Sequence, residues 1–250
     1  MAKREGRSSV EQFFNNPTGQ ASSYQAEGGV EFGLSLPEQI ADVLSSEIIE
    51  GKLPPGSKLP EPTLAERFGT SRAPIREALY LLDQEGLVER APRRGAVVRE
   101  YSRREIEELY RIRSVLEGFA LEHICEEPEM IEVCVATLEP IIRDMERTES
   151  DPKRYHELNF AFHKTIILLS RSQLIRRLYA QIEGPLKIFL RLSFSTAGAV
   201  PKSFGEHLQL LAAIREENVE EARRILEKHD EDGMRRAIAS GKCGQTVKDR

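Results

Sequence analysis

The sequence predicts a mainly α-helical protein: a short N-terminal unit of helices and a β-hairpin, followed by an all-helical antiparallel bundle of about six helices. Two observations indicate this class. Charged residues make up 31% of the chain and aromatic residues only 6%, with no Trp, whereas about 25% charged residues is usual. Apolar residues recur at helical spacing over most of the chain and follow repeated helix-capping sequences.

The composition also excludes several classes of protein. No apolar run approaches the roughly 18 residues that a membrane span needs, and the first residues lack the apolar stretch of a secretory signal. We therefore expect a cytoplasmic protein with no membrane partner. The cysteines Cys125, Cys134 and Cys243 are odd in number and show no CxxC spacing, so neither a disulfide framework nor a cysteine zinc site is expected.

The N-terminal unit is preceded by a polar arm. Residues 1–33 are rich in Ser, Gly, Gln and Asn and show no periodicity, which is typical of a disordered arm. Ser35 and Glu38 then form a capping box, and helical periodicity continues to Gly51. Three prolines within residues 52–60 predict an extended connection after this first helix.

Two further helices and a hairpin complete the N-terminal unit. A short helix over 62–68 and a longer one over 71–84 are separated by the tight turn Gly69–Thr70. Residues 87–99 alternate loosely around a proline and a glycine, which predicts two short strands. This order of elements is that of a winged helix-turn-helix, and we assign it to residues 34–100.

The arginines of this unit indicate a nucleic-acid partner. The formal net charge of the chain is −5, yet residues 67–99 hold seven basic residues, all arginine, against four acidic ones. In the third helix Arg72 and Arg76 lie on a different face from the apolar residues Ile75 and Leu79. A solvated helix face would also carry such arginines, but the tight turn before this helix favours a DNA-reading helix, where guanidinium groups suit phosphate and guanine.

From Ser102 onward the pattern is helical throughout. Ser102, Ser203 and Asn218 are each followed three residues later by a glutamate, as in a capping box. The connections are short, which favours antiparallel neighbours. The predicted helices lie near residues 102–126, 129–148, 152–170, 172–195, 203–216 and 219–238. They form a domain over 101–239, followed by a flexible tail over 240–250.

Two groups of polar residues occupy apolar helix faces in this bundle, and the first is a single arginine. Arg113 falls within the stripe of Ile106, Leu109 and Leu116. A guanidinium that faces a core needs an anion. That anion is either an internal partner, such as Glu117 one turn away, or the carboxylate of a bound ligand.

The second group is a set of histidines on three different helices. His163 lies in a segment that is apolar nearly all round, and Asn159 precedes it by one turn. His207 and His229 occupy inward faces of the last two helices. A lone inward histidine is usually a hydrogen-bonded core residue, but these side chains together match the ligands of a divalent ion such as zinc, nickel or manganese. Four such ligands leave positions open for a small carboxylate, whose charge Arg113 would balance.

The segment Leu59–Leu79, LPEPTLAERFGTSRAPIREAL, and the wing sequence APRRGAVV resemble the GntR family of bacterial transcription regulators. From Tyr110 onward, beginning YRIRSVLE, the chain is similar to the all-helical FCD ligand domain of the FadR subgroup. The residues that carry this similarity are NFAFH at 159–163, Glu206–His207 and Lys228–His229. The resemblance covers all of the chain except the arm and the tail.

The resemblance implies a homodimer that binds double-stranded DNA at a palindromic operator, with the third helix in the major groove and the wing in the minor groove. Many relatives place a DNA-contacting arginine where this chain has Pro62, and Arg67 is the residue that would replace that contact. The implied DNA-binding residues are Arg67, Thr70, Ser71, Arg72, Arg76, Arg94 and Gly95.

For the ligand domain, the resemblance implies a metal held by Asn159, His163, His207 and His229. Metal-binding relatives usually have an aspartate at the position of Asn159. An ion bound here would therefore keep its full charge, be held less tightly, and attract an anionic effector more strongly. Arg113 is the residue that we expect to bind this effector.

These observations favour a ligand-responsive, non-enzymatic transcription regulator, most simply a repressor, that acts at the bacterial nucleoid and senses a small organic acid through a divalent metal. Three alternatives differ from it in class or in ligand. A metal-dependent hydrolase would need an acid or base, and no HExxH spacing is present. A metal-free regulator would sense a different small molecule. A helical scaffold with DNA-binding remnants would lack salt-dependent affinity for DNA.

Overall fold

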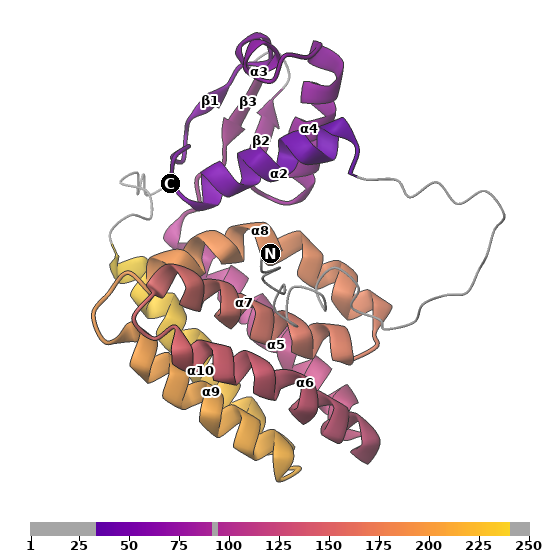
Figure 1. The fold of residues 1–250 in the computed structure, drawn as a ribbon, viewed down its shortest axis with the longest axis vertical. Helices are drawn as coiled ribbons and strands as arrows, with labels where there is room; N and C mark the ends of the chain where they lie inside the picture. Colours follow the sequence, from indigo (N-terminus) through magenta and orange to yellow (C-terminus); the bar gives the residue numbers. More distant parts are fainter. Residues whose placement is uncertain (1–33, 92–94, 241–250) are drawn as a thin grey trace, which may run out of the picture. The chain divides into compact units, whose positions relative to one another are not determined.

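The computed structural model of the chain describes residues 34–91 and 95–240. The arm predicted over 1–33, the wing residue Arg94 and most of the tail predicted over 240–250 lie outside these residues. Within the described ranges the chain forms nine helices and three short strands (Figure 1), which confirms the mainly α class. None of the helices in these ranges is long and apolar enough to cross a membrane.

The N-terminal unit contains three helices and a small sheet. Its elements are α2 (Leu36–Ile49), β1 (Lys58–Leu59), α3 (Glu61–Arg67), α4 (Arg72–Gln84), β2 (Val88–Ala91) and β3 (Gly95–Val98). The strands are antiparallel in the order β1-β3-β2, so that Val97 of β3 has Lys58 on one side and Glu89 on the other. Strand β1 falls in the segment predicted as an extended connection, and it adds an edge to the predicted hairpin.

The core and caps of this unit follow from the sequence pattern. Leu44 of α2 and Leu82 of α4 are fully buried in one apolar cluster. Ser35 and Glu38 form the predicted capping box, in which the Ser35 backbone N–H donates to the Glu38 carboxylate at 2.7 Å. Ser71 is at the predicted N-cap position of α4, but its side chain makes no capping hydrogen bond.

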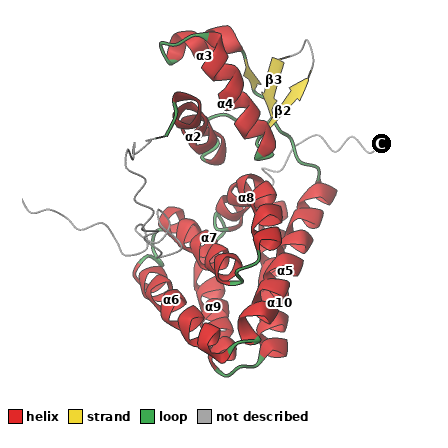
Figure 2. Ribbon diagram, turned by 90° about the vertical axis from the view of Figure 1, so that its right-hand side faces the viewer, coloured by secondary structure: helices red, strands yellow, loops and turns green. Residues whose placement is uncertain are grey.

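Six helices form the bundle shown in Figure 2. They are α5 (Arg103–Cys125), α6 (Pro128–Arg147), α7 (Pro152–Leu169), α8 (Gln173–Ser193), α9 (Ala199–Arg215) and α10 (Val219–Ala239). Helix α7 packs against α5, α6 and α8, while α10 packs against α5, α8 and α9. Because α7 is enclosed in this way, nearly all its residues from Tyr155 to Ile167 are buried, as its apolar sequence predicted.

The predicted start of α9 at Ser203 is wrong. The helix begins at Ala199, one turn earlier, because Gly198 adopts a left-handed conformation with φ of 76° at the N-cap. Ser203 is therefore inside the helix and caps nothing. Its hydroxyl is buried and accepts a hydrogen bond from the hydroxyl of Tyr155 at 3.2 Å. His207 consequently lies two turns into the helix and not in its first turn.

Gly184 of α8 marks a close approach between the bundle and the N-terminal unit. A Cβ atom at this position would lie 2.6 Å from the carbonyl oxygen of Glu85 and 2.9 Å from Cγ of Leu87. Only glycine therefore fits without a backbone shift. One turn further along α8, Ile188 packs against the apolar core of the N-terminal unit. The segment that follows α4 thus rests directly on the backbone of α8.

Candidate metal centre and DNA interface

Three buried histidines and one asparagine meet between α7, α9 and α10. Asn159, His163, His207 and His229 are each at most 3% exposed. The Nε2 atoms of His163 and His229 are 3.2 Å apart, and Nδ2 of Asn159 is 3.2 Å from Nε2 of His207. The three histidines offer ligand atoms that all lie within 4.8 Å of one another. The four residues predicted as metal ligands are thus brought to one point, which we call the metal centre.

The outer nitrogen of each imidazole is held by an acceptor. The three Nδ1 contacts are His163 with Glu117 Oε2 at 2.6 Å, His207 with the Ser203 carbonyl oxygen at 2.7 Å, and His229 with Glu206 Oε2 at 2.8 Å. A carbonyl or an ionised carboxylate only accepts hydrogen bonds. Each Nδ1 therefore carries the ring hydrogen, and each Nε2 presents a lone pair to the centre.

This arrangement of lone pairs suits a cation. Two Nε2 atoms that face each other at 3.2 Å with no hydrogen between them repel unless a positive charge lies nearby. Burial holds the pKa of all three histidines well below the usual value, and positive groups such as Arg113 lower it further. The imidazoles are therefore neutral, which is the form that binds metal. The chemistry of the donor set fits a divalent ion.

Asn159 offers a fourth donor to the same point. Its Oδ1 atom is buried and has no hydrogen-bond partner among the described residues. Rotating the amide group by half a turn exchanges its nitrogen and oxygen, which are assigned from hydrogen bonding, and turns the oxygen toward His207. A buried polar atom without a partner costs about 1–3 kcal/mol. An ion bound to this oxygen would offset that cost.

Arg113 has both an internal partner that the sequence suggested and one that it did not. Its Nε lies 2.8 Å from Oε1 of Glu117 and 3.3 Å from Oδ1 of Asp230. Burial alone would lower the pKa of Arg113, but the carboxyls of Asp230 and Glu117 raise it above its usual value. The guanidinium therefore stays charged. Its Nη2 has no hydrogen-bond partner within the described ranges and is the donor available to a ligand anion.

Asp230 and Glu206 are the site residues that sequence reasoning missed. Asp230 continues the buried stripe of Leu226 and Gly233 on α10, so helical spacing could have found it. Burial raises the pKa of its carboxyl well above the usual value. Glu206 is on α9 and reaches His229 on α10, an interhelical contact that no local pattern reveals.

The predicted DNA-binding residues at the start of α4 are accessible. Arg72 and Ser71 are exposed at the first turn of this helix, and Thr70 is half-buried in the turn before it. Arg76 is also exposed, but its Nε makes an ion pair with Glu61 at 2.7 Å. A surface ion pair of this kind contributes about 0–1 kcal/mol, so DNA phosphates can displace it.

Arg67 and Gly95 differ from these residues in their surroundings. Arg67 makes a two-pronged ion pair with the carboxylate of Glu47 on α2, and its guanidinium lies over the ring of Phe68. Arg67 therefore links α3 to α2. It must release Glu47 before it can make the DNA contact that relatives make with an arginine at the position of Pro62. Gly95 is exposed at the start of β3 with φ of 79°.

The fold and the site define a class of protein: a winged helix-turn-helix joined to a helical bundle that encloses polar ligand groups. A family profile described as bacterial regulatory proteins of the gntR family matches residues 36–98, and the FCD domain matches residues 108–232. The chain belongs to the GntR family, with the FCD architecture of its FadR-like subgroup.

Relatives and solved structures agree with this membership. The chain is 26% identical over 213 residues to the HTH-type transcriptional regulator YdhC of Bacillus subtilis, covering 82% of this chain and 93% of the relative. It is 28% identical over 164 residues to the gluconate operon transcriptional repressor of the same organism, covering 62% of this chain and 63% of the relative. A GntR transcriptional regulator structure from Rhodococcus sp. RHA1 superposes with a TM-score of 0.67 at 22% identity, covering 82% of this chain and 99% of that one.

The chain is accordingly a DNA-binding transcription regulator whose partner is double-stranded DNA, and it is not an enzyme. The sequence-based expectation of a regulator is confirmed, and the hydrolase alternative is set aside. FCD domains bind metal, and the buried histidine and carboxylate groups of this chain have the composition to hold one.

Proposed function

We propose that this chain is a ligand-responsive repressor with two domains that have separate functions. Residues 34–100 form the winged domain that binds DNA, and residues 101–239 form the FCD domain that binds effector and pairs two copies into a homodimer. Several relatives are named transcriptional repressors, which supports repression over activation. A protein that acts on bacterial DNA works in the cytoplasm, at the nucleoid.

The FCD domain is proposed to hold one divalent ion, zinc, nickel or manganese, through Asn159, His163, His207 and His229. The observation that carries this proposal is the convergence of three Nε2 lone pairs in a buried, neutral site. A bound ion would supply positive charge and open coordination positions for a small carboxylate. Because the four ligands bring no charge of their own, that positive charge would be largely available to the effector.

Residues around the metal centre would orient the effector. Glu117 and Glu206 fix the planes of two imidazoles through their Nδ1 atoms. Arg113 is held in place by Glu117 and Asp230, which leaves its Nη2 as the donor for the second oxygen of a carboxylate. We propose that this pairing with Arg113 selects small organic acids.

Effector binding would act on DNA affinity through the geometry of the dimer. Two copies of α4 must enter successive major grooves about 34 Å apart. An effector changes DNA binding only if it binds one arrangement of the two winged domains better than another. Small rotations of the paired FCD domains would be sufficient to change that spacing.

The metal content of the purified protein tests the proposal. Elemental analysis of untagged protein prepared without chelator should find about one divalent ion per chain, and a His207→Ala variant should have lost it. A His123→Ala variant is the matched control, because His123 is exposed on α5 and should leave the metal content unchanged. Absence of metal after supplementation with zinc, nickel and manganese would contradict the proposal and favour the metal-free regulator.

A further inference from the structure

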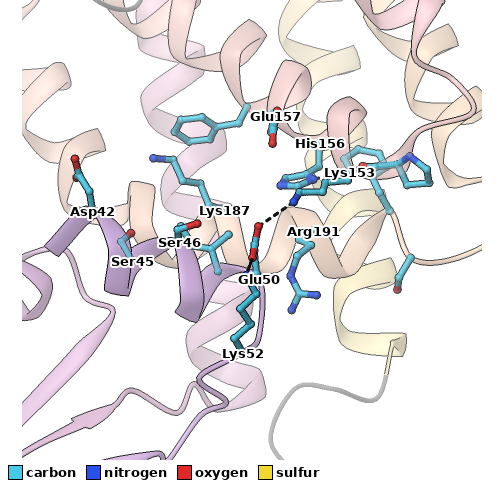
Figure 3. Close-up of a pocket in the computed structure, with 15 residues that line it drawn as sticks. Asp42, Ser45, Ser46, Glu50, Lys52, Lys153, His156, Glu157, Lys187 and Arg191 are labelled. Atoms are coloured by element: carbon cyan, nitrogen blue, oxygen red, sulfur yellow. Dashed lines mark hydrogen bonds and ion pairs between the residues drawn. The ribbon is translucent and has the colours of Figure 1, made fainter. Parts of the chain in front are cut away.

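A cavity lies outside the metal centre, between α2 of the N-terminal unit and α7 and α8 of the bundle. Its volume is about 750 Å³, within the range of about 300–1,000 Å³ that is usual for small-molecule sites. None of the four proposed metal ligands lines it. Figure 3 shows the labelled side chains that surround it, including Lys187 and Arg191 from α8, Ser46 from α2 and Glu50 directly after α2.

One part of the cavity wall is apolar. Phe160 of α7 and Phe194 at the end of α8 are both buried yet line the cavity. Ile49 of α2 lines it as well and is half-buried. These two aromatic rings and the aliphatic side chain form an apolar surface that suits the apolar body of an organic ligand.

Another part of the wall carries two cations of α8 that are weakly paired. Arg191 makes no ion pair in the described part of the chain, and its Nε is buried without a hydrogen-bond partner. Lys187, one turn before it, lies 3.9 Å from Glu183, whose carboxylate already binds Lys164 at 2.9 Å. Lys187 also lies over the ring of Phe160, 4.7 Å from its centroid. Burial lowers the pKa of both Lys187 and Arg191, although nearby carboxylates, Glu183 for Lys187 and Glu50 for Arg191, partly oppose this shift.

Two of the three carboxylates that line the cavity are paired with other residues. Glu50 binds Lys52 at 2.6 Å and Lys153 at 2.8 Å, and the latter pair links the C-terminal end of α2 to α7 (Figure 3). Glu157 binds Arg154 at 2.8 Å. The third, Asp42, is exposed on α2. Arg191 therefore has no ion-pair partner among the described residues, and Lys187 has only the long contact of 3.9 Å with Glu183, so both cations can bind an external anion.

We propose that this cavity binds an amphipathic organic monoanion, an aryl or alkyl carboxylate, with its apolar body against Phe160 and Phe194 and its carboxylate between Lys187 and Arg191. This site would be a second effector site, separate from the metal centre in position and in chemistry. Because its walls come from both α2 and α8, its ligand would contact the DNA-binding unit and the bundle at once. If DNA binding changes the position of α2 in the cavity wall, it changes the affinity for the ligand. By thermodynamic linkage, the ligand then changes the affinity for DNA by the same factor.

Calorimetric titration of naphthylacetate into the full chain, stripped of metal with chelator and dialysed, tests this inference. We expect saturable binding of about one molecule per chain and no binding of the uncharged naphthylacetamide. Arg191→Ala should weaken binding about tenfold or more, because it removes a charged hydrogen bond. Arg177→Ala, an exposed arginine of the same helix outside the cavity, is the matched control and should bind like the parent protein.

Two further variants establish whether naphthylacetate binds in this cavity. Ser46→Trp inserts bulk into the cavity from an exposed position and should abolish binding while circular dichroism shows an unchanged helix content. His207→Ala should leave binding intact, since the metal centre is a different site. Three outcomes would each overturn the inference: equal affinity for acid and amide, unchanged binding in both Arg191→Ala and Ser46→Trp, or loss of binding in His207→Ala. None of these outcomes bears on the metal content of the centre, so this test is independent of the test of the proposed function.

Discussion

At the scale of single residues, Asn159 sets the charge of the metal centre. An aspartate at this position would add a negative charge beside three neutral imidazoles. We therefore expect Asn159→Asp to hold its metal about tenfold or more tightly, as measured by competition with a chelator. The same variant should show weaker coupling between metal and a carboxylate effector, because the ion would present less net charge to it.

The control for this prediction is Gln181→Glu, which adds a charge at an exposed position of α8. This variant should leave unchanged the chelator concentration at which half of the metal is removed from the protein. Calorimetric titration of the parent protein supplies the opposing test: effector affinity that does not change when the metal is removed would contradict the coupling. Equal metal retention in Asn159→Asp and the parent would show that residue 159 is not a ligand.

Arg76 carries the second prediction at this scale. If its guanidinium reads a base, Arg76→Ala should cost about 1–3 kcal/mol of DNA binding and relax specificity at one position of the operator. Fluorescence anisotropy on an operator selected from random DNA and on its single-base variants measures both effects. Uniform weakening on all sequences would mean that Arg76 contacts phosphate only. Arg177→Ala, on an exposed face of α8, should change neither quantity.

Single residues also show where sequence reasoning stops. The inward positions of His163, His207 and His229 follow from helical spacing, and all three are buried. The residues that orient their rings depend on which helices are neighbours in space. Glu206 reaches His229 across a helix pair, and this pairing is set by the tertiary packing of α9 and α10. The second carboxylate on Arg113, from Asp230, depends on packing in the same way.

At the scale of elements, helix α5 has two faces with different roles. Its inner face carries Arg113 and Glu117 toward the metal centre. Its outer face exposes Ile112, Val115 and Phe119 by 47%, 57% and 53%. These three residues follow helical spacing, so they form one apolar stripe. A contiguous stripe of this kind is typical of a surface that another protein covers, and a second copy of α5 is the partner that we propose.

Phe119→Lys tests this role of α5. A charge placed in the stripe should separate the proposed homodimer into monomers, because burying an unpaired ammonium in an apolar interface is costly. Light scattering after size-exclusion chromatography measures the mass directly. Leu208→Lys is the matched control, since Leu208 is 45% exposed on α9 and outside the stripe. A dimer that persists in Phe119→Lys would place the interface elsewhere.

Helix positions were largely predictable, because capping residues and apolar spacing are local properties. The predicted and observed helices agree closely from α2 to α8 and again at α10. Two features were not foreseen: the start of α9 and the strand β1. Helix α9 starts early because Gly198 allows a left-handed turn, and the strand β1 forms because β3 lies beside it. The second of these depends on a partner distant in sequence, so spacing alone does not predict it.

At the scale of the whole molecule, the buried titratable groups determine how stability depends on pH. The three histidines of the metal centre have pKa values well below 6.5 in the folded chain. As pH falls below 6.5, the unfolded chain takes up these three protons and the folded chain does not, so stability falls. Asp230 acts in the opposite sense, because burial raises its pKa and the folded chain keeps a proton that the unfolded chain releases.

Because the three histidine shifts lower stability at acid pH, metal-free protein should lose stability as pH falls below 6.5, by about 1.4 kcal/mol per pH unit for each proton that only the unfolded chain binds. Denaturant unfolding at a series of pH values, with chelator present, measures this slope. Gln181→Ala, at an exposed position of α8, removes no titratable group and should reproduce the parent slope. Stability that stays flat from pH about 7 to about 5 would contradict the buried, neutral state of the histidines.

The close approach at Gly184 limits how this chain can be recombined with its relatives. Regulators built from two domains invite chimeras in which one DNA-reading half is exchanged for another. Here the carbonyl oxygen of Glu85 lies where a side chain at position 184 would begin. A bundle from a relative with alanine at the position of Gly184 would displace the DNA-reading half from its native position on α8. Residue 184 should therefore be treated as part of the DNA-reading half when such hybrids are designed, although it lies 99 residues after Glu85 in the chain.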